Sequence, residues 1–309
     1  MSSNNRLVVF QRALARKSLI SFSRLFNHLS YGFVGFLTNC LLTISYPLIF
    51  RHRKIAKESM DIAFGNTLSL QEKRKIIRKC FKNFGFGMME MLFFMAHPDQ
   101  IANYVSMEGR HHVDEALKKG KGVIAVTAHY GNFPLMMYYC AQAGFSTNSI
   151  IRMARDQELA KFLLEKKREA GLKTIYTMPR GECVSNSLKV LRNNEVLFIP
   201  IDQNFGAEGG VYVDFFGQKA STATGPVVFA LRTGATILPM FIVRNEDNTH
   251  TIIVEPPLTI EEKQDEEATV VHNMGRITRI IEQYIRKYPY EWAWMHRRWK
   301  TRPTMGTAT

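Results

Sequence analysis

The stretch GVIAVTAHYGNFP, residues 122–134, joins an apolar run to a tight turn and then to a helix-start signal. The run Gly122–Ala128 has the character of a strand that is buried on both faces of a sheet. Asn132 is a typical helix N-cap, and Pro134 falls in the first helical turn, where proline is tolerated. A buried strand that leads directly into a helix is the repeating unit of α/β proteins.

The alternation of strand and helix signals continues toward the C-terminus. Short apolar runs predict further strands at residues 148–152, 172–178, 195–201, 236–244 and 249–255. Helical spacing of apolar residues predicts helices at residues 158–171, 222–235 and 270–284. Strands that alternate with helices favour an α/β sandwich built around a buried sheet.

Length and composition limit the possible classes of protein. With 309 residues, 46% of them hydrophobic and 22% charged, the chain is globular and can form one large α/β domain or two smaller ones. The net charge of +14 indicates attraction to an anionic partner, which can be nucleic acid, an anionic membrane surface or an acidic ligand. The four cysteines are scattered singly and form no zinc or disulfide pattern, so we expect reduced thiols.

An uncharged stretch near the N-terminus, Leu29–Phe50, is long enough to cross a bilayer. Basic residues flank it on both sides, so the charge distribution assigns no orientation. A membrane-spanning helix, a helix that lies in the membrane interface and an ordinary buried helix all remain open. We therefore divide the chain into a membrane-associated helical segment, residues 1–60, and an α/β domain, residues 61–309.

A second helix is predicted to begin at the capping box Ser69–Glu72. The segment Phe84–Pro98 that follows is apolar on nearly all sides. This segment is either a core helix or a surface that contacts acyl chains, for which the adaptable side chains of Met and Phe are well suited.

Two polar residues follow predicted buried strands. His129 lies at the carboxyl end of one strand, where functional residues of α/β sheets gather. The dipole of the following helix favours neutral imidazole, the form that a general base requires. A lone histidine in a turn is nevertheless more often structural than catalytic. Asp202 closes the strand at residues 195–201 and is equally compatible with a turn-capping role and a site role.

Residues 209–235 contain several glycines and the helix-start signal at Thr224, Gly225 and Pro226. The N-terminus of such a helix can hold an anion or a developing oxyanion. The alternative is a long loop that packs over the sheet.

The C-terminal segment Trp292–Pro303 interleaves aromatic and cationic residues. This pattern is compatible with a nucleic-acid surface, a membrane-interface anchor or a phosphate-binding tail. The segment carries none of the sequence signatures of common RNA-binding modules.

Together these stretches resemble the late, secondary acyltransferases of lipid A biosynthesis, of the lauroyl- and myristoyltransferase type. The resemblance covers nearly the whole chain and includes the uncharged N-terminal stretch, GKGVIAVTAHYGN, DQN after a strand, VDFFGQKASTATGPVVFALRTGA and WMHRRWKTRP. It implies a glycerolipid-acyltransferase-like α/β sandwich with an N-terminal hydrophobic helix, and an acyltransferase domain on the cytoplasmic face of the bacterial inner membrane.

The resemblance also implies a reaction. A fatty acyl chain would pass from acyl carrier protein, a thioester donor, to a hydroxyl of a phosphorylated sugar lipid. His129 matches the family's general base, and the backbone after His129 or the Thr224–Gly225 helix start would supply donors to the oxyanion. No metal or organic cofactor is implied.

A basic surface would fit both the acidic carrier protein and an anionic glycolipid acceptor. Arg152 matches a position expected to contact the donor or the polar head of the acceptor. The candidate substrate-binding residues are Asn132, Arg152, Thr224, Gly225, Arg297, Arg298 and Lys300.

This chain departs from the family's motif at one position. The motif is His, four residues, then Asp or Glu, and the fifth position after His129 is Pro134, whose side chain cannot accept a hydrogen bond. Three explanations compete: Asp202 replaces the acid, a backbone carbonyl or a water orients the imidazole, or the protein is an inactive lipid-binding relative. Because the rest of the motif framework is intact, the first explanation is favoured.

Other functions remain possible. The same chemistry can act on another glycolipid or on a lysophospholipid, and an inactive relative can still bind lipid or carrier protein. Nucleic-acid binding rests on basicity alone, and the long uncharged stretch argues against it.

Overall fold

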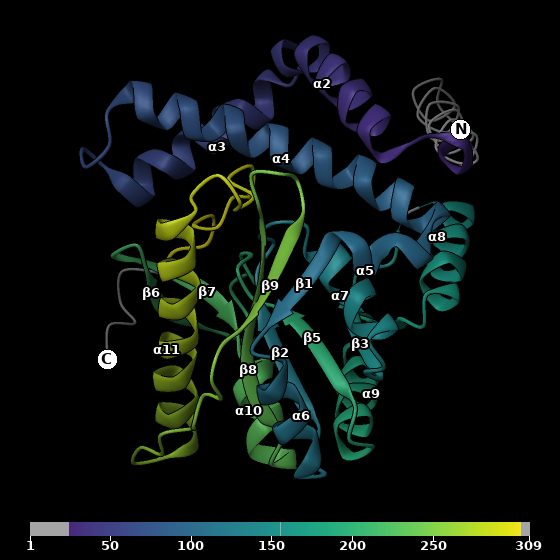
Figure 1. Cartoon of the computed structure of the whole chain (residues 1–309). Coiled ribbons are helices and arrows are strands. Elements are labelled where there is room, and N and C mark those ends of the chain that lie inside the picture. Colours follow the sequence, from purple (N-terminus) through teal and green to yellow (C-terminus); the bar gives the residue numbers. More distant parts are fainter. Residues whose placement is uncertain (1–24, 155, 304–309) are drawn as a thin grey trace, which may run out of the picture.

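The computed structural model describes residues 25–154 and 156–303 of the chain (Figure 1). Its main sheet has seven strands in the order β1-β9-β8-β2-β5-β3-β4. The strands are β1 (Val105–Glu108), β2 (Val123–Thr127), β3 (Thr147–Ile151), β4 (Lys173–Tyr176), β5 (Val196–Pro200), β8 (Thr236–Arg244) and β9 (His250–Val254). All of these strands except β1 overlap strands that the sequence predicts, so the predicted α/β class is confirmed.

The sheet is mostly parallel. Strands β8, β2, β5, β3 and β4 run in one direction, whereas β9 is antiparallel to β8 and β1 is parallel to β9. Parallel neighbours need a long crossover, which is usually a helix, and this requirement explains the alternation in the sequence. A short turn, in which the Asn245 amide donates to the Thr249 carbonyl at 2.8 Å, instead reverses the chain between β8 and β9.

Successive residues of β2 point to opposite faces of the sheet, and both faces are covered. Ile124 and Val126 belong to one buried cluster, and Val123 and Ala125 belong to the other. A strand buried on both sides has no polar face, which is why residues 122–128 form one continuous apolar run.

Helices lie on both faces of the sheet (Figure 1). On one face α9 (Arg180–Arg192) packs on β4 and β5, and α10 (Gly225–Thr233) packs on β2, β8, α9 and α11 (Glu266–Lys287). On the other face lie α6 (Arg110–Lys118) and α7 (Phe133–Gln142), while α8 (Gln157–Glu169) packs on the edge strand β4. The predicted helices at residues 158–171 and 270–284 correspond to α8 and α11.

The sequence predicts no strand between residues 209 and 223 and allows a long loop there, whereas the structure has a β-hairpin. Strands β6 (Gly210–Phe215) and β7 (Gln218–Ala223) pair antiparallel around Phe216 and Gly217, both of which have positive φ. The helix predicted at residues 222–235 therefore begins only at Gly225, because Thr222 and Ala223 belong to β7. The helical spacing of the segment did not distinguish its first two residues from a strand end.

A helical layer lies across one end of the sheet (Figure 1). It comprises η1 (Phe26–His28), α2 (Tyr31–Leu48), α3 (Phe50–Phe64), α4 (Leu70–Ala96), η2 (Pro98–Gln100) and α5 (Ile101–Tyr104). The predicted capping box at the start of α4 is present: the Glu72 amide donates to Ser69 Oγ, and the Ser69 amide donates to Glu72 Oε2. Residue 60, where the sequence divides the chain, lies inside α3, and residues 1–24 lie outside the described part.

The uncharged N-terminal stretch, residues 29–50, forms α2 and ends at the first residue of α3, and a sharp bend separates the two helices. Pro47 lies near the end of α2, and α3 begins at Phe50 with the axes bent by 82°. Among the described residues no single helix is both long enough and apolar enough to cross a membrane. The bent pair of α2 and α3 together has the length and the apolar composition that a membrane span requires.

Candidate active site

The pairing of β2 with β5 brings His129 and Asp202 together. Thr127 and Pro200 are paired in register at the carboxyl ends of these parallel strands, and each polar residue follows its strand end by two positions. His129 Nδ1–H donates to Asp202 Oδ1 at 2.9 Å. Adjacent parallel strands end on the same side of a sheet, so equal offsets after paired residues place the two side chains side by side.

Asp202 has no exposed side-chain surface, and both of its oxygens accept hydrogen bonds. Its second oxygen, Oδ2, accepts from Trp292 Nε1–H at 2.8 Å. Burial opposes ionisation, but the His129 ring and the Trp292 donor outweigh it and hold the pKa of Asp202 well below its usual value. Asp202 is therefore an ionised acceptor with one donor on each oxygen, and it orients the imidazole.

The net effect of these surroundings raises the pKa of His129 above its ordinary value of 6.5. Burial lowers this pKa, but the charge of Asp202 and its hydrogen bond together raise it by more. The sequence predicts a bias toward neutral imidazole from the dipole of α7; the carboxylate dominates instead. When neutral, His129 carries its proton on Nδ1 and leaves Nε2 as a base.

His129 Nε2 faces two residues that sequence reasoning did not select. Gln203 Nε2 lies 3.0 Å from His129 Nε2 and 3.3 Å from His296 Nε2. The His129 and His296 ring centroids are 5.2 Å apart in an edge-to-face arrangement. Gln203 lies in the DQN motif and His296 in the C-terminal segment, and neither has a local sequence signal that separates it from its neighbours.

The C-terminal segment after α11 pairs with the His129 turn. Tyr130 and Trp292 form an antiparallel bridge, and the Ala293 amide donates to the His129 carbonyl at 3.1 Å. This pairing places Trp292 beside Asp202 and His296 beside Gln203. The aromatic and cationic composition of the segment indicated a binding surface, whereas Trp292 is fully buried and supports the His–Asp pair.

Arg298 was expected to bind the anionic lipid head, but the structure places it inside the protein. Its side chain is fully buried, and its guanidinium donates to the backbone oxygens of Gln203 and Ser221 and to Thr222 Oγ1. A buried guanidinium needs several acceptors, and the carbonyls of two segments supply them. Arg298 thus holds the loop of Gln203 against β7 and does not face a ligand.

A pocket opens beside His129 under α4, with a volume of about 300 Å³ that includes open solvent. It is lined by Cys80, Asn83, Phe84, His129, Gly131, Phe133, Glu291, Trp292 and Ala293. Burial raises the pKa of Glu291 to about 7, and Asn83 Nδ2 donates to its Oε1 at 2.9 Å. Pro134 is not among the lining residues, and Phe133 contacts the His129 ring edge-to-face at a centroid distance of 4.8 Å.

Asn132, expected among the substrate-binding residues, is buried and fully engaged within the protein. Its Oδ1 accepts from the Leu135 amide, as the N-cap prediction requires, and its Nδ2 donates to Glu90 Oε2 at 3.0 Å. The prediction that it caps α7 is confirmed, and its side-chain oxygen and nitrogen both bond within the protein. Asn132 instead connects the His129 turn to a buried ionic network.

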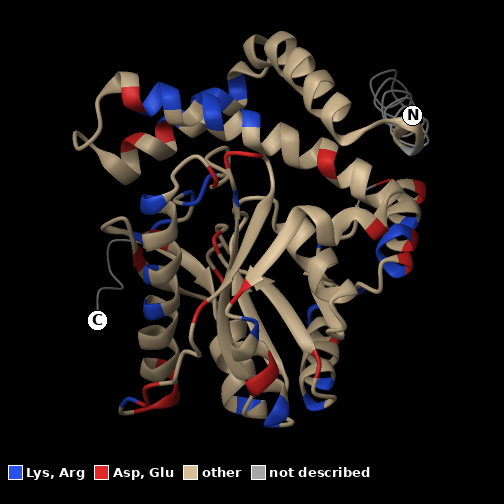
Figure 2. Ribbon diagram, viewed as in Figure 1, with Lys and Arg blue, Asp and Glu red and all other residues tan. Residues whose placement is uncertain are grey.

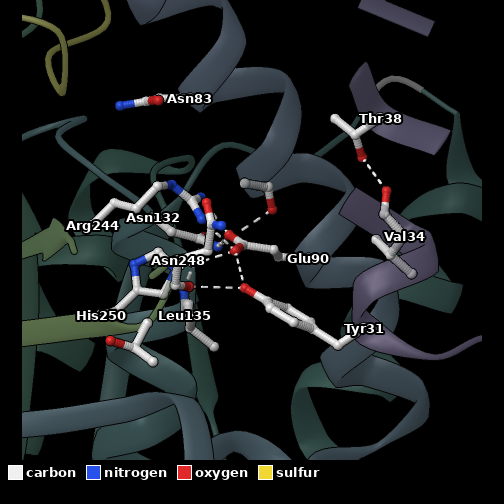
Figure 3. A network of polar contacts seen from close by, with 12 residues as sticks. Tyr31, Val34, Thr38, Asn83, Glu90, Asn132, Leu135, Arg244, Asn248 and His250 are labelled. Atoms are coloured by element: carbon white, nitrogen blue, oxygen red, sulfur yellow. Dashed lines mark hydrogen bonds and ion pairs between the residues drawn. The ribbon is translucent and has the colours of Figure 1, made fainter. Parts of the chain in front are cut away.

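That network is centred on Glu90 of α4 (Figure 3). Arg244 of β8 forms a bidentate pair with its carboxylate at 2.5 and 2.6 Å, and His250 of β9 and Tyr31 of α2 also contact it. Burial alone raises the pKa of Glu90, but Arg244 and His250 lower it to about 2. Glu90 lies in the apolar segment 84–98, where a single carboxylate has no sequence pattern that indicates its partners.

The remaining predicted contact residues lie on three different segments of the chain. Thr224 lines a second, open hollow that shares no lining residue with the His129 pocket, and Gly225 begins α10. Arg152 is exposed directly after β3, the strand beside β5, and Arg297 and Lys300 are exposed on the C-terminal segment. In the described part of the chain no group of three or more His, Cys, Asp or Glu residues could hold a metal ion.

Comparisons with known proteins identify relatives along most of the chain. Residues 15–301 match the family described as bacterial lipid A biosynthesis acyltransferase. The lipid A biosynthesis lauroyltransferase of Escherichia coli (strain K12) is 27% identical over 257 residues, which are 82% of this chain and 80% of the relative. The lipid A biosynthesis palmitoleoyltransferase of the same organism is 24% identical over 292 residues, 89% of this chain and 87% of the relative. The phosphatidylinositol mannoside acyltransferase of Mycobacterium tuberculosis (strain ATCC 25618 / H37Rv) is 27% identical over 135 residues, 42% of each chain.

Proposed function

The chain belongs to the family of bacterial lipid A biosynthesis acyltransferases, and on that premise we propose that it moves a fatty acyl chain from acyl carrier protein to a hydroxyl of a lipid A precursor. His129 acts as the general base and Asp202 as its acidic partner. The observation that carries this assignment is the 2.9 Å hydrogen bond between His129 Nδ1 and Asp202 Oδ1. It supplies the carboxylate that Pro134 cannot, which favours an active enzyme over an inactive relative.

The geometry supports the following step. The acceptor hydroxyl attacks the thioester carbonyl carbon, its proton passes to His129 Nε2, and the carbonyl electron pair moves onto oxygen. The tetrahedral intermediate then collapses, the C–S bond breaks, and the leaving thiolate takes the proton from the imidazolium. The products are the ester and the free thiol of the carrier, and Asp202 stabilises the transient imidazolium without being protonated.

The two substrates are both anionic, and exposed cations near the site suit them. Arg152 follows β3, and Arg297 and Lys300 lie on the segment that pairs with the His129 turn. We assign these three residues to contacts with phosphate groups of the acceptor or with the acidic carrier protein. Their exposure, in contrast to the burial of Arg298, makes them available to such ligands.

We also propose that the helical layer attaches the enzyme to the cytoplasmic face of the inner membrane, with α2 in the interface. Large apolar side chains between 43% and 75% exposed lie along α2 and at the start of α3: Phe33, Phe36, Leu41, Ile44, Leu48 and Phe50. Lysines and arginines gather on α3 and the first half of α4 (Figure 2): Arg51, Lys54, Lys57, Arg74, Lys75, Arg78, Lys79 and Lys82 are exposed. Apolar side chains beside cations are the combination that binds an anionic lipid surface.

A second candidate keeps the chemistry and changes the acceptor to another glycolipid. The similarity to a phosphatidylinositol mannoside acyltransferase over 42% of the chain supports this second acceptor class. Mass spectrometry of lipids from a deletion strain separates the two, because loss of an acyl group from lipid A supports the first and an unaltered lipid A supports the second.

The base assignment is tested with purified full-length enzyme, an acylated carrier protein and a phosphorylated lipid A precursor. His129→Ala should lower turnover by roughly 10²–10⁴-fold, because the hydroxyl loses its proton acceptor. The matched control is His272→Ala, since His272 is an α11 histidine that contacts Glu261 and should leave turnover unchanged. Wild-type turnover in His129→Ala would contradict the assignment.

A further inference from the structure

The side-chain amide of Gln203 lies between two imidazoles, at 3.0 Å from His129 Nε2 and 3.3 Å from His296 Nε2. Asp202 accepts the Nδ1 proton of His129, so Nε2 of the neutral ring carries a lone pair and can only accept. The Gln203 group that faces it must therefore be the NH₂ rather than the carbonyl oxygen. An amide nitrogen has two hydrogens, and the second is directed to His296.

The acyl transfer needs a donor for the oxyanion, and the first two backbone amides after His129 are already engaged within the protein. The Tyr130 amide donates to the Ala128 carbonyl at 2.8 Å, and the Gly131 amide donates to the Glu291 carbonyl at 2.9 Å. The expected alternative, the start of α10, has Thr224 at a different hollow. A side-chain donor at the His129 ring would meet the need.

We propose that Gln203 is a catalytic residue whose side-chain NH₂ donates to the acyl carbonyl oxygen as that oxygen becomes an anion. This assignment rests on the proposed acyl transfer. An acceptor hydroxyl that hydrogen-bonds to His129 Nε2 must occupy the place where the Gln203 nitrogen now lies. The displaced amide then remains next to the reacting carbon, and no bond to Gln203 forms or breaks.

Two contacts keep the displaced amide close to the reaction. The Gln203 carbonyl accepts from Arg298 Nη1 at 3.1 Å, so a buried guanidinium holds the backbone while the exposed side chain turns. His296 accepts one hydrogen of the amide, which leaves the other free for the oxyanion. Asp202 and Gln203 are consecutive, so the residue that orients the base also places the donor.

The test compares Gln203→Met, which keeps the side-chain length and removes both hydrogens, with the wild type. We expect kcat to fall by roughly 10²–10³-fold, the loss seen when one oxyanion donor is removed, while KM changes by a few-fold at most. Gln203→Glu, which replaces the donor with an acceptor, should lose at least as much. The matched control is Gln142→Met, since Gln142 donates to the Pro98 carbonyl at 2.9 Å on α7 and should leave kcat unchanged.

Nitrogen NMR of the histidine rings separates a donor from a residue that only positions the base. In Gln203→Met the Nδ1–H tautomer of His129 should persist, because Asp202 is unchanged. A lower kcat with this tautomer intact supports the donor role, whereas a changed tautomer, or wild-type kcat, overturns it. An inactive wild type would instead contradict the proposed function. Loss of activity in His129→Ala but not in Gln203→Met would support His129 as the base and overturn Gln203 as the oxyanion donor.

Discussion

At the scale of residues, the site depends on a chain of hydrogen bonds that fixes which ring nitrogen of His129 carries its proton. Trp292 donates to Asp202, Asp202 accepts from His129, and Gln203 donates to the free nitrogen of His129. Because Asp202 is buried, its charge acts on the imidazole with little screening by water. The basicity of His129 is therefore set by one carboxylate.

This arrangement predicts a shift in the pH dependence of kcat/KM. The raised pKa of His129 means that the base becomes neutral, and the enzyme active, only as pH rises above 6.5. Asp202→Asn removes the charge that raises this pKa and leaves burial, which lowers it, so the acidic limb of the profile should move to lower pH. Turnover should also fall by roughly 10²–10⁴-fold, because the imidazole loses its orientation and charge stabilisation.

The shift is measured as the difference between variant and wild type, so the titration of Glu291 in the same pocket contributes equally to both. Asp247→Asn, at an exposed turn between β8 and β9, is the control and should leave the profile unchanged. An acidic limb that stays at the wild-type pH in Asp202→Asn would mean that another group sets the basicity of His129.

At the scale of elements, α4 connects the helical layer to the His129 turn. Its residues line the His129 pocket, and Glu90, further along the same helix, contacts Tyr31 of α2, Arg244 of β8 and Asn132 of the turn. His250 of β9 also contacts Glu90, so one buried carboxylate joins five segments, and the loss of its charge affects all of them. The capping box at Ser69 stabilises the opposite end of the helix and is independent of the site.

Glu90→Gln should destabilise the fold more than any exposed ion pair would. It leaves the buried Arg244 guanidinium without a counter-charge, which costs about 3–5 kcal/mol and, for a chain of this length, lowers Tm by roughly 5–8 °C. Breaking the exposed pair between Glu169 and Lys166 by Glu169→Gln should cost less than about 1 kcal/mol. Thermal unfolding followed by circular dichroism measures both, and equal Tm values for the two variants would contradict the importance of the network.

At the scale of the whole molecule, the exposed apolar side chains and the exposed cations occupy the same helical layer. This layer lies across one end of the sheet (Figure 1), and its cations gather on α3 and α4 (Figure 2). Residues of α4 in the same layer line the pocket of His129. A surface that binds lipid would therefore present the pocket to a membrane-embedded acceptor. The axes of α2 and α3, the two helices that carry these exposed apolar side chains, are bent by 82° relative to each other.

Membrane attachment is tested by co-sedimentation with vesicles that contain anionic phospholipid. The double variant Ile44→Asp/Leu48→Asp should move from pellet to supernatant, because it places two carboxylates on side chains that are 70% and 71% exposed. The control Leu231→Asp/Val271→Asp introduces the same charges on α10 and α11, where the side chains are 38% and 37% exposed, and should stay with the pellet. Sedimentation of the first variant with vesicles would show that another surface attaches the protein.

The sequence alone determined the strands of the parallel sheet, the caps of α4 and α7, and the positions of His129 and Asp202, because each depends on neighbours along the chain. An apolar run, a cap and a strand end are local patterns whose physical causes lie within a few residues. Tertiary structure decided the rest. It placed Arg298, Asn132 and Trp292 inside the protein, joined Glu90 to Arg244 across 154 residues, and brought Gln203 and His296 to the base. Burial and long-range pairing depend on how sheet and helices pack, and side chains of the same type on the same segment can then point to a ligand or into the core.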